Sequence, residues 1–366
     1  MEETLTENVG QARVEENKKN RIKSIDIAKA IGIFLIVLGH TLEFGELRKF
    51  IYSFHVPLFF FLSGLCFSRK KNIIFIKKKI LTIYVPYLIV SIISIGIYTI
   101  LGPNIGADNL NLFDNIKGML YANPNLNNMQ WNQPLWFLPA LMIQLILINV
   151  FENIISNTEQ RKYIRIIVVT IFCILGYVLS EFKVFLPFQL EAALCMLIFT
   201  YMGILIKNKK EKLLRNNAIK RLKNKKSILI IYCIVSIIIS AILVRYNETL
   251  SVMQDKYGNY LIYLIVNVLM ITNIMIVSKF IDNIMSRQKL ISYIGRNTLF
   301  ILLVHKFPIL FFQKVCPLVK DILNKEDSIV NNLIGILISL IVIGMCIAFK
   351  YIIDLIILRS KKYDTN

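Results

Sequence analysis

The chain has 366 residues, of which 56% are hydrophobic, and it carries a formal net charge of +20. Its mean hydropathy of +0.60 is above the range usual for soluble domains and indicates a multi-pass membrane protein. The six cysteines include no Cys-x-x-Cys pair, which argues against both a zinc site and a disulfide framework.

Ten apolar segments approach the roughly 20 residues that a helix needs to cross a bilayer. They are residues 25–42, 51–68, 80–101, 134–151, 166–180, 188–206, 227–244, 258–278, 291–312 and 329–349. We therefore predict an all-α polytopic membrane protein with three parts. A cytoplasmic tail over 1–24, with no apolar core of a signal peptide, precedes a ten-helix membrane domain over 25–349, and a cytoplasmic tail over 350–366 follows.

The basic residues are distributed unevenly between the two sides that this alternation creates. With residues 1–24 in the cytoplasm, the inner segments hold 31 Lys and Arg residues and the outer segments hold 9. This bias follows the positive-inside rule and predicts that both termini are cytoplasmic. It also explains most of the net charge as contact with anionic lipids at the inner face, which excludes a nucleic-acid partner.

The first predicted span carries Asp26, Lys29 and His40. Lys29 and His40 are eleven positions apart, which is about three helical turns, so both side chains lie on one face at a separation of about 16 Å. Ionisable residues inside a span are costly and indicate function by default. A simpler alternative is that Asp26 and Lys29 pair with each other on one helix.

The three histidines of the chain, His40, His55 and His305, all fall in spans and all in the predicted outer half of the membrane. Two further cations, Arg296 and Lys306, also fall in spans. Histidine suits a general base acting on a hydroxyl group. The alternative for His55 and His305 is a structural hydrogen bond between helices.

Three other residues near the outer face are candidates for the same site. Glu191 and Glu43 can orient a histidine, although the position of either favours an ordinary interfacial residue. Trp136, in the stretch Pro134-Leu-Trp-Phe-Leu-Pro139, can stack on a substrate or belong to an interfacial aromatic belt. The long, Asn-rich outer segment 102–133 is expected to form a lid or a sugar-facing surface.

Several motifs together resemble the membrane acyltransferase 3 family. They are Arg21-x4-Asp26-x2-Lys29-x10-His40, Phe54-His55-x-Pro57-Leu-Phe-Phe-Phe-Leu-Ser63-Gly64, Pro86-Tyr87, Leu135-Trp-Phe-Leu-Pro139, and Gly295-Arg-Asn-Thr-Leu-Phe300 with His305. The branch that the chain most resembles includes sugar and polysaccharide O-acetyltransferases of bacterial envelopes. The chain departs from the family by having Lys29 where many members have Arg, and Lys77, Lys78 and Lys79 near a paired-arginine motif found in some members.

The resemblance implies transfer of an acyl group, usually acetyl from cytosolic acetyl-CoA, to a hydroxyl of an envelope glycan or lipid-linked sugar at the bacterial cell membrane. It implies that His40 is catalytic, with Lys29 as its basic partner and Asp26 beside it. We expect Arg296 and Lys77–Lys79 to meet the CoA phosphates at the inner face. We expect His55, His305, Trp136 and Glu191 to contribute to the acceptor site. No metal is expected. The alternative function is a transporter or flippase for glycan precursors or small solutes, which would use the same buried charges for gating.

Overall fold

The structure is a computed structural model that describes residues 22–101, 111–155, 161–215, 226–284, 289–315 and 328–363. The predicted N-terminal tail lies outside these residues apart from its last three, and so do the last three residues of the predicted C-terminal tail. Every named element in the described chain is helical, and none is a strand. The predicted all-α fold class is therefore confirmed for this part of the chain.

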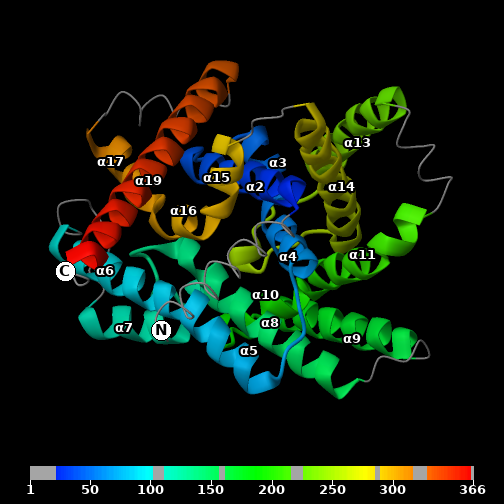
Figure 1. Cartoon of the computed structure of the whole chain (residues 1–366), viewed down its shortest axis with the longest axis horizontal. Helices are drawn as coiled ribbons and strands as arrows, with labels where there is room; N and C mark the ends of the chain where they lie inside the picture. The colour runs from blue at the N-terminus through cyan, green and yellow to red at the C-terminus, as the bar shows by residue number, and fades with distance from the viewer. Residues whose placement is uncertain are drawn as a thin grey trace, which may run out of the picture.

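The helices that position the site come from the whole length of the chain (Figure 1). In the first half they are α2 (Lys23–Thr41), α3 (Glu46–Tyr52), α4 (His55–Leu65), α5 (Asn72–Lys79), the π-helix η1 (Ile80–Tyr84), α6 (Val85–Leu101), α7 (Leu112–Tyr121), the 3-10 helices η3 (Pro124–Leu126) and η4 (Gln133–Trp136), and α8 (Phe137–Ile154). In the second half they are α9 (Lys162–Glu181), η6 (Pro187–Gln189), α10 (Leu190–Cys195), α11 (Leu197–Arg215), α13 (Lys226–Tyr246), η7 (Val252–Gln254), α14 (Tyr260–Ile284), α15 (Lys289–Arg296), α16 (Thr298–Val304), α17 (Lys306–Val315) and α19 (Ile329–Tyr363).

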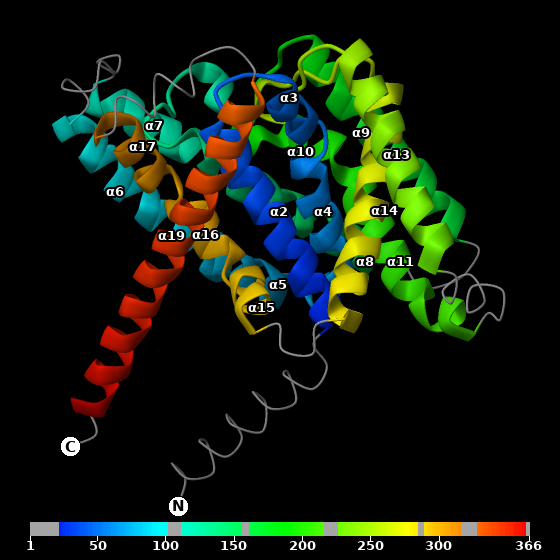
Figure 2. The same cartoon turned by 90° about the horizontal axis from the view of Figure 1, so that it is seen from above.

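Seven of the described helices are long and apolar enough to cross a membrane, or up to nine if two bent helix pairs each count as one span. The bent pairs are Pro187–Cys195 with Leu197–Asn208, at 60°, and Lys289–Arg296 with Thr298–Gln313, at 62°. The peripheral helices α9 and α13 leave many isoleucines exposed, as expected of helices that face lipid (Figures 1 and 2). The protein is thus a multi-pass membrane protein.

The predicted second span, 51–68, is not one continuous helix. The chain breaks at Ser53 and Phe54, between α3 and α4, and α4 has only 11 residues. At 1.5 Å per residue α4 is about 16 Å long, which is too short to cross a bilayer alone. Nine of its residues are buried in protein, and Asn267 of α14 donates a hydrogen bond of 2.9 Å to the carbonyl of Ser53 at the break. Irregular backbone at membrane depth is tolerated where other parts of the protein supply hydrogen-bond partners for its N–H and C=O groups, as Asn267 does here.

Helix α2 runs through the middle of the bundle (Figures 1 and 2). It packs against α15, α14, α19 and α4. The contact with α15 is at backbone distance, since a Cβ atom on Gly295 would lie only 1.8 Å from the carbonyl oxygen of Asp26. Figure 2 shows the beginning of α2 and the end of α19 on one side of the bundle and α3 on the other. The predicted count of ten spans is not confirmed by the seven to nine candidates among the described residues, and which side is cytoplasmic stays a prediction.

Helices α4 and α11 pack against each other equally closely, and α4 also packs against α2. A Cβ atom on Gly64 would lie 1.9 Å from the carbonyl oxygen of Thr200, and one on Gly203 would lie 2.2 Å from that of Phe61. Gln144 of α8 joins this contact, because it accepts a hydrogen bond of 2.6 Å from the Thr200 hydroxyl and donates one of 2.6 Å to the carbonyl of Ala193. Small residues at a helix interface allow such backbone approach in a membrane protein.

Candidate functional site

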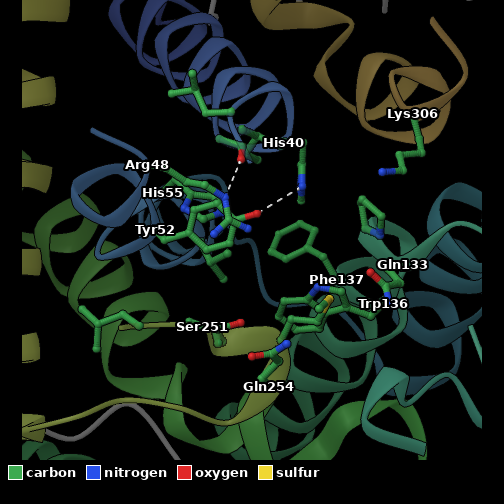
Figure 3. A pocket seen from close by; sticks show the side chains of 18 of the residues that line it. His40, Arg48, Tyr52, His55, Gln133, Trp136, Phe137, Ser251, Gln254 and Lys306 are labelled. Carbon is green, nitrogen blue, oxygen red and sulfur yellow. Dashed lines mark hydrogen bonds between the residues drawn. The ribbon is translucent and has the colours of Figure 1, made fainter. Parts of the chain in front are cut away.

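A cavity of about 500 Å³ opens at the end of α2 that carries His40 (Figure 3). Its size is within the range usual for small-molecule sites. The labelled side chains that surround it come from α2, α3, α4, η4, α8, the segment that ends in η7, and α17. They are His40, Arg48, Tyr52, His55, Gln133, Trp136, Phe137, Ser251, Gln254 and Lys306. Helices from both ends of the chain therefore build one site.

His40 is held by a tyrosine that the sequence analysis did not single out. The Tyr52 hydroxyl lies 3.3 Å from Nδ1 of His40, as the dashed line in Figure 3 marks. The guanidinium of Arg48 lies 4.2 Å from the centre of the Tyr52 ring, and its Nε donates to the carbonyl of Gly39 at 3.3 Å. Because the contact with Tyr52 is made at Nδ1, it leaves Nε2 of His40 available to a substrate in the cavity.

The other two predicted histidines lie beside this pair of His40 and Tyr52. The ring of His305 lies 5.3 Å from that of His40, and the ring of His55 lies 4.9 Å from that of Tyr52, measured between centroids. Both are anchored to backbone carbonyls through Nδ1, His55 to Ile51 at 2.9 Å and His305 to Leu302 at 2.8 Å. An Nδ1–H that donates to a carbonyl fixes the tautomer and leaves the Nε2 lone pair free. In His305 this Nε2 is buried without a hydrogen-bond partner among the described residues.

The predicted basic residues lie at the opposite end of α2. Lys29 and Lys79 are half-buried, and the Lys79 ammonium lies within electrostatic reach of Lys29 and Lys78. Lys77 and Lys78 are exposed on α5. Arg296 is exposed beside Gly295, whose contact with the backbone of Asp26 brings the end of α15 against the start of α2. The predicted basic residues therefore gather around one end of α2, and the histidines gather around the other end.

The other predicted acceptor-site residues divide between the cavity and a separate buried cluster. Trp136 lines the cavity and is 4% exposed. Glu191 lies outside the lining, fully buried, and its carboxylate accepts hydrogen bonds from Asn123 Nδ2 at 2.6 Å and from the Leu186 backbone at 3.0 Å. The Glu191 carboxylate is therefore engaged in this cluster and does not orient His40. Glu43 lies at the rim, where it accepts from Gln313 at 3.2 Å.

One wall of the cavity is built by a segment that the sequence analysis missed. Residues 247–259, here the roof loop, connect α13 to α14 and contribute residues 249–254 to the lining. The loop is closed at its base by Asn247, whose side-chain oxygen accepts from the backbone of Asn259 at 2.8 Å. Ser251 and Lys256 pair as an isolated antiparallel bridge within it. The segment 102–133, expected to form a lid or a sugar-facing surface, contacts this loop through Asn125 and lines the cavity through Gln133. Its residues 102–110 lie outside the described chain.

Side chains from three other elements hold the roof loop in place. Asp255 accepts hydrogen bonds from Asn125 Nδ2 at 2.6 Å and from the hydroxyl of Ser180 at 3.3 Å. Gln189 donates to the carbonyl of Met253 at 2.6 Å. These bonds join the loop to η3, α9 and η6, and so fix the polar wall opposite His40.

Asp255 makes the stability of this arrangement sensitive to pH. Burial, with a smaller contribution from the charge of Glu191, raises the pKa of Asp255 from 3.8 to about 8. Between these values the folded protein keeps a proton that the unfolded chain releases, so stability falls as pH rises from about 4 to 8, by at most about 1.4 kcal/mol per pH unit. We expect Asp255→Asn to remove this slope from the melting temperature measured against pH, provided that the Asn125 amide turns to accept.

Glu248→Gln is the matched control, because Glu248 is an exposed carboxylate of the same roof loop. It should keep the slope of the wild type. Equal slopes for the wild type and Asp255→Asn would contradict the role given to Asp255.

Arg48, Tyr52 and Lys306 reach the cavity although the sequence analysis assigned them no role. The sequence could have identified Lys306 as a site residue, since it is a basic residue inside a predicted span. Arg48 and Tyr52 gave no such indication, because a basic and an aromatic residue are ordinary at a membrane boundary. Among the described residues, no group of three or more His, Cys, Asp or Glu side chains is arranged to hold a metal ion.

Comparison with known proteins agrees with these features. No curated protein matches the chain significantly. A family model described as an acyltransferase domain, that of the membrane acyltransferase 3 family, matches residues 22–353. The match begins just before α2 and ends within α19, so it includes every helix that contributes to the cavity. The chain therefore belongs to the acyltransferase 3 family and is a membrane acyltransferase.

Proposed function

We propose that the protein transfers an acetyl group from cytosolic acetyl-CoA to a hydroxyl of a cell-envelope sugar or polysaccharide, with His40 as the general base. The observation that carries this proposal is the arrangement of α2. One end of the helix presents His40 to a polar cavity, and the other end lies among cations suited to the phosphates of CoA. A bacterial cytoplasmic membrane, with acetyl-CoA on one side and glycan on the other, is the setting that this arrangement fits.

The chemical step uses one proton that His40 takes and returns. The acceptor hydroxyl attacks the thioester carbonyl while Nε2 of His40 removes the hydroxyl proton. The tetrahedral intermediate then collapses, the C–S bond breaks, and the imidazolium returns the proton to the departing thiolate. The products are the O-acetyl ester and free CoA. Tyr52 supports this role, since its hydroxyl at 3.3 Å from Nδ1 restricts the orientation of the ring.

The donor must cross part of the membrane to reach His40. Lys29 and His40 are about 16 Å apart along α2, a distance that the thin pantetheine arm of CoA can span while its phosphates stay near the inner cations. The cavity already extends one turn below His40, since Ile36 is among its lining residues. Lys29, Lys79 and Arg296 then hold the phosphates, with Lys77 and Lys78 adding positive charge at the surface.

The lining of the cavity fits a hydroxylated acceptor. Three amides, those of Gln133, Gln254 and Gln313, line it together with Trp136 and Ser251. Amide and hydroxyl groups that fix orientation beside an aromatic surface are the usual composition of a small-molecule site. His55 and His305 support the site through their contacts with Tyr52 and His40 rather than by lying alone in a helix interface.

The test is the turnover of acetyl-CoA by purified protein in nanodiscs, measured as CoA release. We expect Lys29→Met to raise the KM for acetyl-CoA by about tenfold, the effect of losing one charge-assisted hydrogen bond of about 1.5 kcal/mol. The exposed Lys23 of the same helix end gives the matched control, and Lys23→Met should leave KM unchanged. A folded wild type that neither binds nor turns over acetyl-CoA would contradict the proposal, and transport assays in vesicles would then test the alternative.

A further inference from the structure

The charges that surround the cavity are unbalanced. Among the described lining residues, those of the lysine, arginine, aspartate and glutamate types are Arg48, Lys306 and Glu43, so the basic side chains outnumber the acidic ones. Glu43 is exposed at the rim, where its carboxylate accepts from Gln313. Arg48 is already engaged with the Tyr52 ring and with the carbonyl of Gly39. A positive charge therefore remains inside the cavity for which the described residues supply no buried partner.

Lys306 is the source of that charge. It is half-buried at the start of α17, and Figure 3 shows its side chain reaching toward His40. Among the described residues its ammonium makes neither a hydrogen bond nor an ion pair. The acidic group that interacts with it electrostatically is Glu43 at the rim. A lysine side chain is long enough to turn its ammonium toward bulk water, so one that points into a cavity at an ordered site is suited to bind an anion there.

We propose that this cavity selects an acceptor that carries an anionic group, a carboxylate or a phosphate, beside the hydroxyl that is acylated, and that Lys306 binds this group. The inference rests on the proposed function, because it names the class of acceptor for that reaction. The acceptor is then an acidic sugar or a phosphorylated polyol, held by Lys306 on one side and by the amides and Trp136 on the other. Binding of the anion places the neighbouring hydroxyl at Nε2 of His40.

The donor phosphates are a competing source of negative charge, and so is the oxyanion of the tetrahedral intermediate. The three assignments differ in what Lys306→Met changes. Loss of an acceptor anchor weakens binding of charged acceptors alone. Loss of a CoA contact raises the KM for acetyl-CoA, and loss of an oxyanion contact lowers kcat for charged and neutral acceptors alike.

The experiment measures binding by tryptophan fluorescence of the full-length protein in nanodiscs, with Trp136 as the reporter inside the cavity. Two matched pairs of probes distinguish an acceptor carboxylate from an acceptor phosphate. Methyl β-D-glucuronide against methyl β-D-glucoside tests the carboxylate, and glycerol 3-phosphate against glycerol tests the phosphate. We expect the charged member of at least one pair to bind about tenfold more tightly, which corresponds to about 1.4 kcal/mol, with a preference that declines as salt is added.

Lys306→Met should abolish this preference and leave the affinity for the neutral probes unchanged. Lys256→Met is the matched control, because Lys256 is an exposed cation of the roof loop that does not line the cavity, and it should keep the preference. No charge-dependent binding in the wild type, or a preference that survives in Lys306→Met, overturns the inference. CoA release measured in the same preparations tests the proposed function separately, since acetyl-CoA turnover can succeed while the anion preference fails.

Discussion

Replacing His40 with glutamine should lower kcat for CoA release by about 10²- to 10⁴-fold, the usual contribution of a general base. Glutamine keeps a polar group near the Tyr52 hydroxyl but cannot take the hydroxyl proton. The KM for acetyl-CoA should stay nearly unchanged, because the residues proposed to hold the donor phosphates lie at the other end of α2. Steady-state kinetics with a saturating acceptor gives both constants.

Tyr52→Phe is the graded variant for this test. It removes the hydroxyl that contacts Nδ1 and keeps the ring that packs against Arg48 and His55. We expect a loss in kcat of about two- to tenfold, which matches a neutral hydrogen bond of about 0.5–1.5 kcal/mol. A His40→Gln protein that is folded and retains wild-type kcat would rule out His40 as the base.

Gly64→Val should destabilise the protein more than any substitution of a cavity residue. Any Cβ at this position meets the backbone of Thr200, with the carbonyl oxygen at 1.9 Å and the carbonyl carbon at 2.8 Å. Helices α4 and α11 must then separate, and the hydrogen bonds that Gln144 makes across this contact are lost with it. We expect a loss of about 3 kcal/mol or more, since overpacking that moves backbone lies at the upper end of its usual range.

Gly96→Val is the matched control, because Gly96 lies in α6 and a Cβ atom on it would meet no heavy atom within 4 Å among the described residues. It is an equally helical glycine that faces open space, so its substitution should leave the melting temperature close to that of the wild type. The melting temperatures of both variants are measured by heating the proteins in detergent and monitoring the loss of the folded peak by size-exclusion chromatography. Equal melting temperatures for the two variants would show that the α4–α11 contact relaxes at little cost.

The hydrophobic pattern of the sequence predicts most of the fold because lipid demands it. The segment 227–244 matches α13 within two residues at each end, and the segment 258–278 matches α14 within two residues at its start and six at its end. Each helix must form its own backbone hydrogen bonds in the membrane, which is why the apolar pattern predicts them. The predicted span 51–68 fails as a single helix because its apolar residues are buried in protein rather than in lipid. Apolarity alone does not distinguish these two environments, so the break at Ser53 and its partner Asn267 were not predictable.

The site was predictable where a residue type contradicts its environment. His40, His55 and His305 were found in this way, and the structure brings His40 and His305 together at 5.3 Å between their rings. Glu191 satisfied the same criterion but lies in the buried cluster behind the roof loop. Glu191 lies in a helix pair that is bent by 60°, and hydrophobic periodicity does not reveal such a bend. The roof loop itself has an ordinary loop composition, and only its contacts with Asn125 and Gln189 give it a place at the cavity.

The central position of α2 has a consequence for the synthesis of the protein. Of the described helices, the one that carries His40 is synthesised first, yet α15 and α19, which pack against it, are among the last. Roughly 250 residues separate the end of α2 from the start of α15, which takes about 12 to 50 s to translate at 5–20 residues per second. During that interval Asp26 has no Gly295 against its backbone, and Thr41 lacks the hydroxyl of Ser339 that later lies 3.2 Å away. The nascent chain must therefore hold α2, with its ionisable residues Asp26, Lys29 and His40, in the membrane without these partners until the C-terminal helices are made.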